Sequence, residues 1–179
     1  RIVKAATFEG VMPKGAVSDD LIAFHRTIAA GGVGMTTVAY CAIAPGGRVQ
    51  RNGIVLEEGS IPGLRRLTDA VHDEGAAIAA QVGHAGYVAN YASNKVPSVG
   101  PSTRLSPAAG TVVKGASESQ IDQLVEQYRS AAKVAVESGF DAIELHLGHN
   151  YLLSSFLSPN LNKRKDRYGG SIENRLRFP

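Results

Sequence analysis

Short β-rich runs alternate with amphipathic helical patterns along this chain, and this alternation limits the possible folds more than any other feature. The helical patterns open near capping residues and close at glycines. Strands that alternate with helices pair in parallel and are covered by those helices, so the pattern predicts an α/β fold with a parallel sheet. We expect its strands at residues 2–7, 34–40, 76–82 and 141–147.

The helical patterns carry their own start and stop signals. The clearest covers residues 117–139, where Ser117 and Gln120 form a capping-box pattern and apolar side chains follow at helical spacing. Ser18 and Ser60 are placed to cap two earlier helices. We therefore expect helices at residues 18–32, 60–75 and 117–139, with a fourth beginning near residues 171–174.

A parallel sheet with outer helices can be doubly wound or closed into a barrel. A Rossmann fold needs a glycine fingerprint directly after its first strand, and "ATFEGVMPKG" is not one. No GxxxxGK[ST] phosphate loop occurs either. These observations favour a parallel (β/α)₈ TIM barrel, with only the first four βα units in this chain. We expect one domain over residues 1–179.

The connections differ in length according to their direction. Those from helix to strand are very short, whereas those from strand to helix are long and span residues 41–59, 83–116 and 148–170. In barrels the active site is built from the loops at the carboxyl ends of the strands. The candidates at those ends are Thr7, Phe8, Tyr40, Cys41, Gln81, His84, His146, His149 and Tyr151.

Composition argues against several other functions. The net charge is only +3, and the densest basic run, residues 162–167, is interrupted by an acid, so we expect no nucleic-acid partner. No signal peptide or apolar run of membrane-spanning length occurs, which predicts a cytoplasmic protein without a membrane partner. The single cysteine, Cys41, excludes an intramolecular disulfide and a cysteine-based metal cage, and we interpret it as a packing residue.

His146 and His149 lie three residues apart at the end of the fourth strand, and Tyr151 follows. Histidines at this spacing on a strand point to opposite faces, so they converge only if the chain turns. On spacing alone, three interpretations stay open. The pair could be one buried and one exposed histidine, a zinc site that lacks an obvious third ligand, or two donors to one carbonyl oxygen with a phenol as proton donor.

Gln81 ends the third strand inside an apolar run, where its amide needs hydrogen-bond partners. A planar heteroaromatic ring would provide them, and so would a neighbouring loop. His25 and His72 lie within helical patterns and are expected at the surface or an interface. Residue chemistry alone therefore predicts a barrel-type enzyme with a histidine, tyrosine and glutamine site.

The segment "GFDAIELHLGHNYLLSSFLSPNLNKRKDRYGGSIENRLRF" closely resembles the signature of the Old Yellow Enzyme family of FMN-dependent ene-reductases and NADH:flavin oxidoreductases. The family's H-x-x-[HN]-x-Y-L-x-x-x-F-L-S-P and N-x-R-x-D-x-Y-G-G-S-x-E-N-R runs are both present. "RIVKAAT", "AYCAIAPGGR" and "AAQVGHAG" resemble the family's first three strand ends. The resemblance covers nearly the full chain but only the N-terminal half of the family's barrel.

This resemblance implies roles for individual residues. His146 and His149 would bind the carbonyl or nitro oxygen of an electron-poor alkene, and Tyr151 would donate the proton. Gln81 would hydrogen-bond the pyrimidine edge of FMN. The backbone that would line the flavin ring lies around Ala5, Ala6, Thr7 and Tyr40. No metal is implied.

The activity implied is NAD(P)H-driven reduction of activated C=C bonds in enones, enoates or dienoyl thioesters, with hydride from flavin N5. An amine dehydrogenase or demethylase of the same family is an alternative, and so is an inactive half-barrel that serves in association. Phe8 and Tyr87 stand where the family often has other residues, which leaves the flavin and substrate contacts there open.

The partners follow from the same resemblance. A small molecule is the expected substrate. Four strands alone would leave two open sheet edges, so we expect a C-terminal half, a second copy or a homo-oligomer to complete the barrel. The chain begins at Arg1 inside an apolar run and stops within a helical pattern, and we expect it to be part of a longer protein.

Overall fold

The computed structural model describes residues 2–179, so Arg1, the first residue of the expected domain, lies outside the described residues. Its main sheet contains four parallel strands in the order β1-β2-β3-β7. These are β1 (Val3–Lys4), β2 (Met35–Ala42), β3 (Ala77–Gly83) and β7 (Ala142–Leu145). A doubly wound sheet places its first strand in the middle, whereas these strands lie side by side in chain order, as in a barrel. The expected four units are therefore present.

Helices follow these strands as the alternation predicts. They are α1 (Asp19–Ala30), α2 (Ile61–His72), α4 (Glu118–Glu137) and α6 (Ile172–Arg175), with the short α5 (Leu152–Leu157) ahead of α6. Ser117 and Gln120 form the predicted capping box, and Ser18 accepts a hydrogen bond from the Leu21 N–H at 3.1 Å. Ser60 occupies the N-cap position of α2 as predicted, but its side chain makes no capping hydrogen bond to the helix. Its hydroxyl instead donates to the Glu57 carbonyl at 2.7 Å within the 3₁₀ turn Glu58–Ser60 that precedes the helix.

The long connection from β3 to α4 contains secondary structure of its own. It contains the 3₁₀ turn Gly86–Val88, the short α3 (Tyr91–Asn94) and a small sheet of β4 (Val99–Gly100), β5 (Arg104–Ser106) and β6 (Thr111–Gly115). The side chain of Tyr87 organises this segment, because its hydroxyl donates to the Ser102 carbonyl and accepts from the Ser102 N–H. Apolar spacing alone carries no signal for such contacts.

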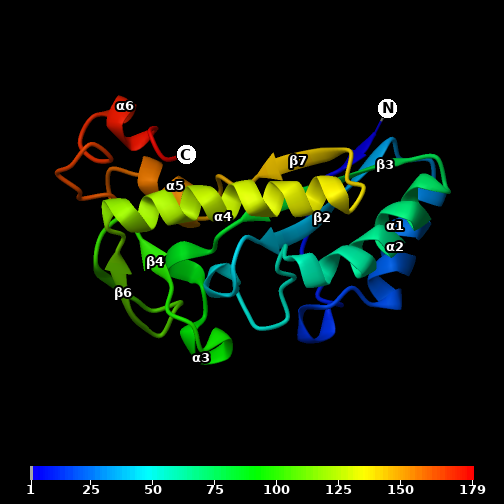
Figure 1. Cartoon of the computed structure of the whole chain (residues 1–179), viewed down its shortest axis with the longest axis horizontal. Helices are drawn as coiled ribbons and strands as arrows, with labels where there is room; N and C mark the ends of the chain where they lie inside the picture. The colour runs from blue at the N-terminus through cyan, green and yellow to red at the C-terminus, as the bar shows by residue number, and fades with distance from the viewer. Residues whose placement is uncertain (1) are drawn as a thin grey trace.

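The elements that follow the strands gather at one end of the sheet. The arrowheads of β2 and β7 point toward the side where α3, β4, β6, α5 and α6 lie (Figure 1). The helix α4 runs lengthwise beside the sheet, and α1 and α2 lie together near the opposite end. The long connections therefore meet at the carboxyl ends of the strands, where a barrel builds its active site.

Burial differs sharply between the central and the edge strands. In β2 and β3 most side chains are buried, and Val38, Cys41 and Ile78 are fully so. Burial raises the pKa of the Cys41 thiol to about 12, which fits a packing residue rather than a nucleophile. At the edges, the side chain of Val3 is 54% exposed and that of Leu145 is 47% exposed. Apolar side chains on both edge strands thus lack cover from the residues that the structure describes.

The prediction that His25 lies at the surface or an interface is wrong, because its side chain is completely buried. Its Nδ1 lies 2.8 Å from Thr36 Oγ1, and its Nε2 lies 3.1 Å from Glu9 Oε1. The polar partners come from the β1 and β2 segments, which the helical pattern around His25 does not reveal. His72 is exposed as expected and contacts Asp141 at 2.9 Å. Within residues 2–179, no helix is both long and apolar enough to cross a bilayer.

Candidate active site

The chain turns sharply after β7, and this turn decides how the two histidines lie. His149 and Asn150 both have φ of 56°, in the left-handed region that residues other than glycine rarely occupy. The Tyr151 N–H closes the turn by donating to the Gly148 carbonyl at 3.0 Å. Because the chain reverses here, His149 returns toward His146, and their ring centroids lie 5.1 Å apart.

A backbone contact fixes the orientation of the His146 ring. The Gly148 N–H donates to His146 Nδ1 at 3.1 Å, so a neutral ring carries its proton on Nε2. Burial lowers the pKa of His146 and a charge on His149 acts in the same direction, whereas Glu144 raises it. At neutral pH, His146 is therefore a neutral donor through Nε2. This atom lies 3.4 Å from His149 Nδ1, too long for a strong bond to compete with a ligand.

Two tyrosines complete a ring of aromatic side chains around His146. The Tyr151 ring lies 4.3 Å from His146 and the Tyr40 ring 6.0 Å from it, measured between centroids. The Tyr40 hydroxyl donates to the Gly47 carbonyl and is occupied. The Tyr151 hydroxyl has no hydrogen-bond partner among residues 2–179, and burial raises its pKa. Tyr151 thus keeps its proton at neutral pH, and its hydroxyl donates to no other residue of the described chain.

These side chains line one cavity of about 360 Å³. Gly83 favours this close packing, because an added Cβ would lie 3.1 Å from His146 Cβ and 3.3 Å from Tyr40 Cδ2 and would press on both. The cavity is lined by Ala6, Phe8, Ala39, Tyr40, Val49, Gln50, Gly53, Gln81, His146, His149 and Tyr151. His146 is buried and His149 is exposed, as the first interpretation stated, and both line one cavity together with Tyr151.

Gln81 and Glu144 lie opposite each other on β3 and β7, and Gln81 Nε2 donates to Glu144 Oε1 at 2.6 Å. This bond leaves one N–H and the carbonyl oxygen of the Gln81 amide for another partner. Phe8 and Tyr40 supply apolar and aromatic walls to the same cavity. A planar ring with alternating donors and acceptors, such as the flavin of FMN, fits this combination of side chains.

Of the predicted cofactor residues, Ala6, Tyr40 and Gln81 line the cavity, whereas Ala5 and Thr7 do not. Side chains alternate along extended backbone, so Ala6 and Phe8 lie on the cavity side and Ala5 and Thr7 on the other. Thr7 Oγ1 donates to the Ala5 carbonyl at 3.4 Å, and both residues are exposed. Their backbone contact with the flavin stays a prediction.

The sequence did not single out four of the lining residues, which are Ala39, Val49, Gln50 and Gly53. The last three come from the connection after β2, whose length was the only signal that it contributes to a site. No group of three histidine, cysteine, aspartate or glutamate side chains within residues 2–179 is placed to hold a metal ion.

Comparisons with known proteins agree with this geometry. A model of the NADH:flavin oxidoreductase / NADH oxidase family matches residues 1–179. The 4,4'-dithiodibutanoate disulfide reductase of Rhodococcus erythropolis is 66% identical over 179 residues, which are 100% of this chain and 44% of that protein. The metal reductase of Desulforamulus reducens is 41% identical over 178 residues, which are 99% of this chain and 27% of that protein.

The same likeness extends to solved structures. The Old Yellow Enzyme homologue from Zymomonas mobilis matches with a TM-score of 0.90 at 26% identity, over 99% of this chain and 53% of that chain. These matches confirm the resemblance read from the sequence and the TIM-barrel fold class. The chain spans less than half the length of the curated relatives above.

Proposed function

Because the chain belongs to the NADH:flavin oxidoreductase / NADH oxidase family, we propose that it contributes the site of an FMN-dependent enzyme that reduces activated C=C bonds with NAD(P)H. The observation that carries this proposal is the convergence of His146, His149 and Tyr151 on one cavity that Gln81 also lines. Enones, enoates and dienoyl thioesters are the substrate class, since each carries a carbonyl oxygen conjugated to the double bond.

The two histidines act on that carbonyl oxygen. As hydride adds to the β carbon of an enone, negative charge builds on the oxygen, and fixed donors stabilise this charge more in the transition state than in the ground state. His146 offers its Nε2–H because the Gly148 N–H holds the opposite ring nitrogen. His149 lies within reach of the same point because the left-handed turn returns its ring toward His146.

Tyr151 supplies the proton to the α carbon. Burial raises the pKa of its phenol, so the group stays protonated at neutral pH and acts as an acid rather than as a phenolate. Its ring lies 4.3 Å from His146 between centroids, so the donor sits beside the carbonyl-binding pair. Proton donor and oxyanion donors thus face one bound substrate.

Gln81, Ala6, Phe8 and Tyr40 are the residues of this chain that would hold FMN against the strand ends. When bound, FMN supplies the hydride. The Gln81 amide would present one N–H and its carbonyl oxygen to the ring edge, in an orientation set by Glu144. Phe8 would cover part of the ring with its exposed aromatic face.

Flavin spectroscopy tests the proposal directly. The purified, FMN-loaded protein should be bleached by NAD(P)H and regain its flavin absorbance on addition of cyclohexenone. Bleaching by an amine in place of NAD(P)H would support the amine dehydrogenase alternative. A protein that takes up no flavin from added FMN would contradict the proposal and support an association module.

A second candidate is disulfide reduction, which the 66% identity to a disulfide reductase favours. Two-electron cleavage of an S–S bond releases two sulfurs, each of which needs a proton to become a thiol. Tyr151 is placed to donate one of these protons. The residues that line the cavity include no cysteine, and Cys41 is buried elsewhere in the core. Reoxidation of the bleached protein by 4,4'-dithiodibutanoate, compared with cyclohexenone at equal concentration, ranks the two substrates.

We also infer that further strands pair with β1 and β7. The exposed side chains of Val3 and Leu145 and the free backbone edges favour continuation of the sheet on both sides. A C-terminal half or a second copy would provide the strands. Light scattering of the purified protein distinguishes these partners, because a self-completed barrel requires at least two copies of this chain.

A further inference from the structure

A second cavity, of about 560 Å³, lies outside the site and is strongly basic. Four cationic side chains line it and form what we call the basic cluster: Lys14, Arg48, Arg51 and Lys95. Its remaining lining residues are Ala92, Ser93 and Asn94, so none of them is acidic. Three separate segments of the chain therefore contribute cations to one cavity.

Hydrogen bonds between loops hold the cluster together. The Arg51 N–H donates to Ser93 Oγ at 2.8 Å, and Asn94 Nδ2 donates to the Arg48 carbonyl at 2.6 Å. Lys95 then ends α3 in a left-handed conformation, with φ of 58°. These contacts hold α3 against the connection after β2, so the backbone that carries the cationic residues is fixed by hydrogen bonds.

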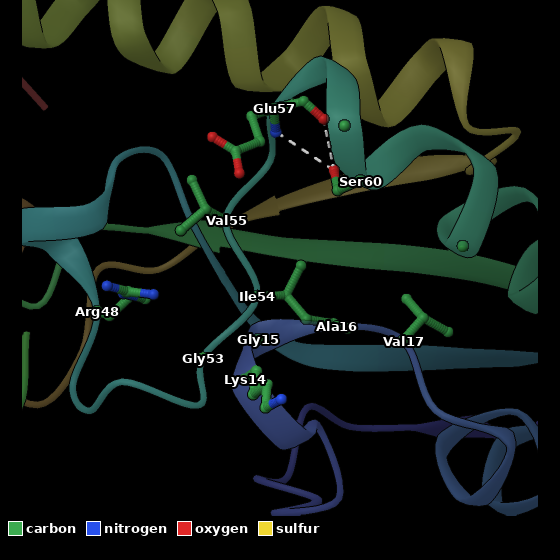
Figure 2. A pocket seen from close by; sticks show the side chains of 12 residues that line it. Lys14, Gly15, Ala16, Val17, Arg48, Gly53, Ile54, Val55, Glu57 and Ser60 are labelled. Carbon is green, nitrogen blue, oxygen red and sulfur yellow. Dashed lines mark hydrogen bonds between the residues drawn. The ribbon is translucent and has the colours of Figure 1, made fainter.

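Lys14 joins the cluster through a close contact between backbones. A Cβ added at Gly15 would lie 2.8 Å from the Gly53 carbonyl oxygen, so only glycine allows this approach. Figure 2 shows Lys14 and Arg48 on either side of Gly53, at an adjoining cavity of about 410 Å³. Glu57 is the acidic residue of that adjoining cavity, and it forms no ion pair with either cation.

The charges of the cluster are not neutralised within the part of the chain that the structure describes. Arg48 donates through Nε to the Pro45 carbonyl and through Nη1 to the Arg51 carbonyl, which leaves Nη2 free. The side chains of Lys14, Arg51 and Lys95 donate no hydrogen bond to residues 2–179. Cations gathered without acidic partners repel one another, so an anion that binds between them relieves this repulsion.

The cluster lies directly beside the proposed active site. Within residues 48–53, Val49, Gln50 and Gly53 line the site cavity, whereas Arg48 and Arg51 line the basic one. A molecule whose reacting end lies at the histidines can therefore extend across this short segment. Its other end would meet the cations.

We propose that the basic cluster binds the phosphate groups of a molecule whose reacting end occupies the active site. Several cations around one cavity suit a group with more than one negative charge, and guanidinium and ammonium donors pair well with phosphate oxygens. This inference rests on the proposed function. Two sources share the chemistry: the nicotinamide dinucleotide reductant and a coenzyme A thioester substrate.

Replacement of two cluster residues tests the proposal. Arg51→Gln and Lys95→Gln are combined in the FMN-loaded protein, because neither side chain bonds to the described chain. Dissociation constants are measured by calorimetry for the non-reducing tetrahydro form of NADH and for coenzyme A. At least one of the two dissociation constants should rise about tenfold, because two charge-assisted contacts are lost. A rise for the dinucleotide assigns the reductant, and a rise for coenzyme A assigns the substrate.

The matched control removes the same charges from the exposed face of α4, with Arg129→Gln and Lys133→Gln combined. It should leave both dissociation constants unchanged. Binding of a simple phenol, which carries no phosphate group, should be the same in all three proteins. Both constants staying within about twofold in the cluster variant would overturn the proposal. Failure of the unmodified protein to bind phenol would count against the proposed function instead.

Discussion

His84 and His146 lie at the ends of neighbouring strands, and the same contact holds both rings. In each case the N–H of a glycine two residues later donates to Nδ1, at 3.0 Å from Gly86 and 3.1 Å from Gly148. The two H-x-G sequences thus produce one local device at the ends of β3 and β7. It places the proton of a neutral ring on Nε2 in both places.

Their surroundings separate the two histidines. His84 is packed so closely that a Cβ on Gly47 would lie 2.7 Å from its Cδ2, and burial lowers its pKa to about 4. His84 lines a separate cavity of about 310 Å³, whereas His146 lines the site cavity together with His149 and Tyr151. The short motif fixes the tautomer, and the segments packed around it decide which side chains and which cavity each ring meets. A donor role toward a ligand is proposed for His146 alone.

The sharpest way to break this comparison is to remove the donors. We expect His146→Ala to lower kcat/KM for cyclohexenone by about 10²–10³, the loss typical of a missing oxyanion donor. His84→Asn keeps an acceptor for the Gly86 N–H and should lower kcat/KM by less than about tenfold. Equal losses in the two variants would show that the difference in surroundings does not matter.

For the pH dependence of folding stability, in contrast to activity, we expect the larger effect from His84. His84 has a folded pKa of about 4, below the ordinary 6.5, so the unfolded chain binds a proton that the folded chain excludes. The contribution of His84 to the free energy of unfolding is fully present above pH 6.5. It is lost as the pH falls toward 4, by up to about 3 kcal/mol. Denaturant unfolding should therefore show a shallower acid decline in His84→Asn. A decline as steep as that of the unmodified protein would contradict the assignment.

Tyr151→Phe sharpens the comparison within the site itself. It removes the proposed proton donor but leaves both histidines, so we expect the rate of reoxidation by cyclohexenone to fall about 100-fold. Bleaching by NAD(P)H should proceed at its usual rate, since that half of the reaction needs no proton from this phenol. Stopped-flow absorbance measures the two halves separately, and a loss in both would indicate damage to flavin binding.

The smallest effect is expected at Glu144, which bonds Gln81 across the same two strands. Glu144→Ala frees the Gln81 amide to rotate, and the dissociation constant for FMN should rise about threefold. Glu144→Gln keeps an acceptor and should bind FMN nearly as the unmodified protein does. Fluorescence titration with FMN compares them, and an unchanged constant in Glu144→Ala would exclude an orienting role.

Much of the fold could be predicted because it depends on local signals. Glycine stops, the Ser117 cap and apolar runs mark the four βα units, and chain order of the strands follows from a barrel. The small sheet around Tyr87 and the burial of His25 could not be predicted. Both depend on partners distant in sequence, such as Ser102 and Glu9.

The candidate site shows the same division. The residue types at the strand ends indicated a histidine, tyrosine and glutamine site, but the direction of His149 was undetermined. Its left-handed backbone, with φ of 56°, is one that sequence propensity disfavours for histidine, and it is this turn that brings the two rings together. The loop residues Val49 and Gln50 carry no chemical signal and join the site only through the fold.

Phenol binding tests the central claim most directly, because the proposed function predicts that a phenolate binds between the histidines where the substrate oxygen would lie. The FMN-loaded protein should give a long-wavelength charge-transfer band with p-hydroxybenzaldehyde. We predict that this band is lost when His146 and His149 are both replaced by alanine and is kept in His84→Asn. A band that survives replacement of both His146 and His149 would contradict their assignment as the oxygen-binding pair.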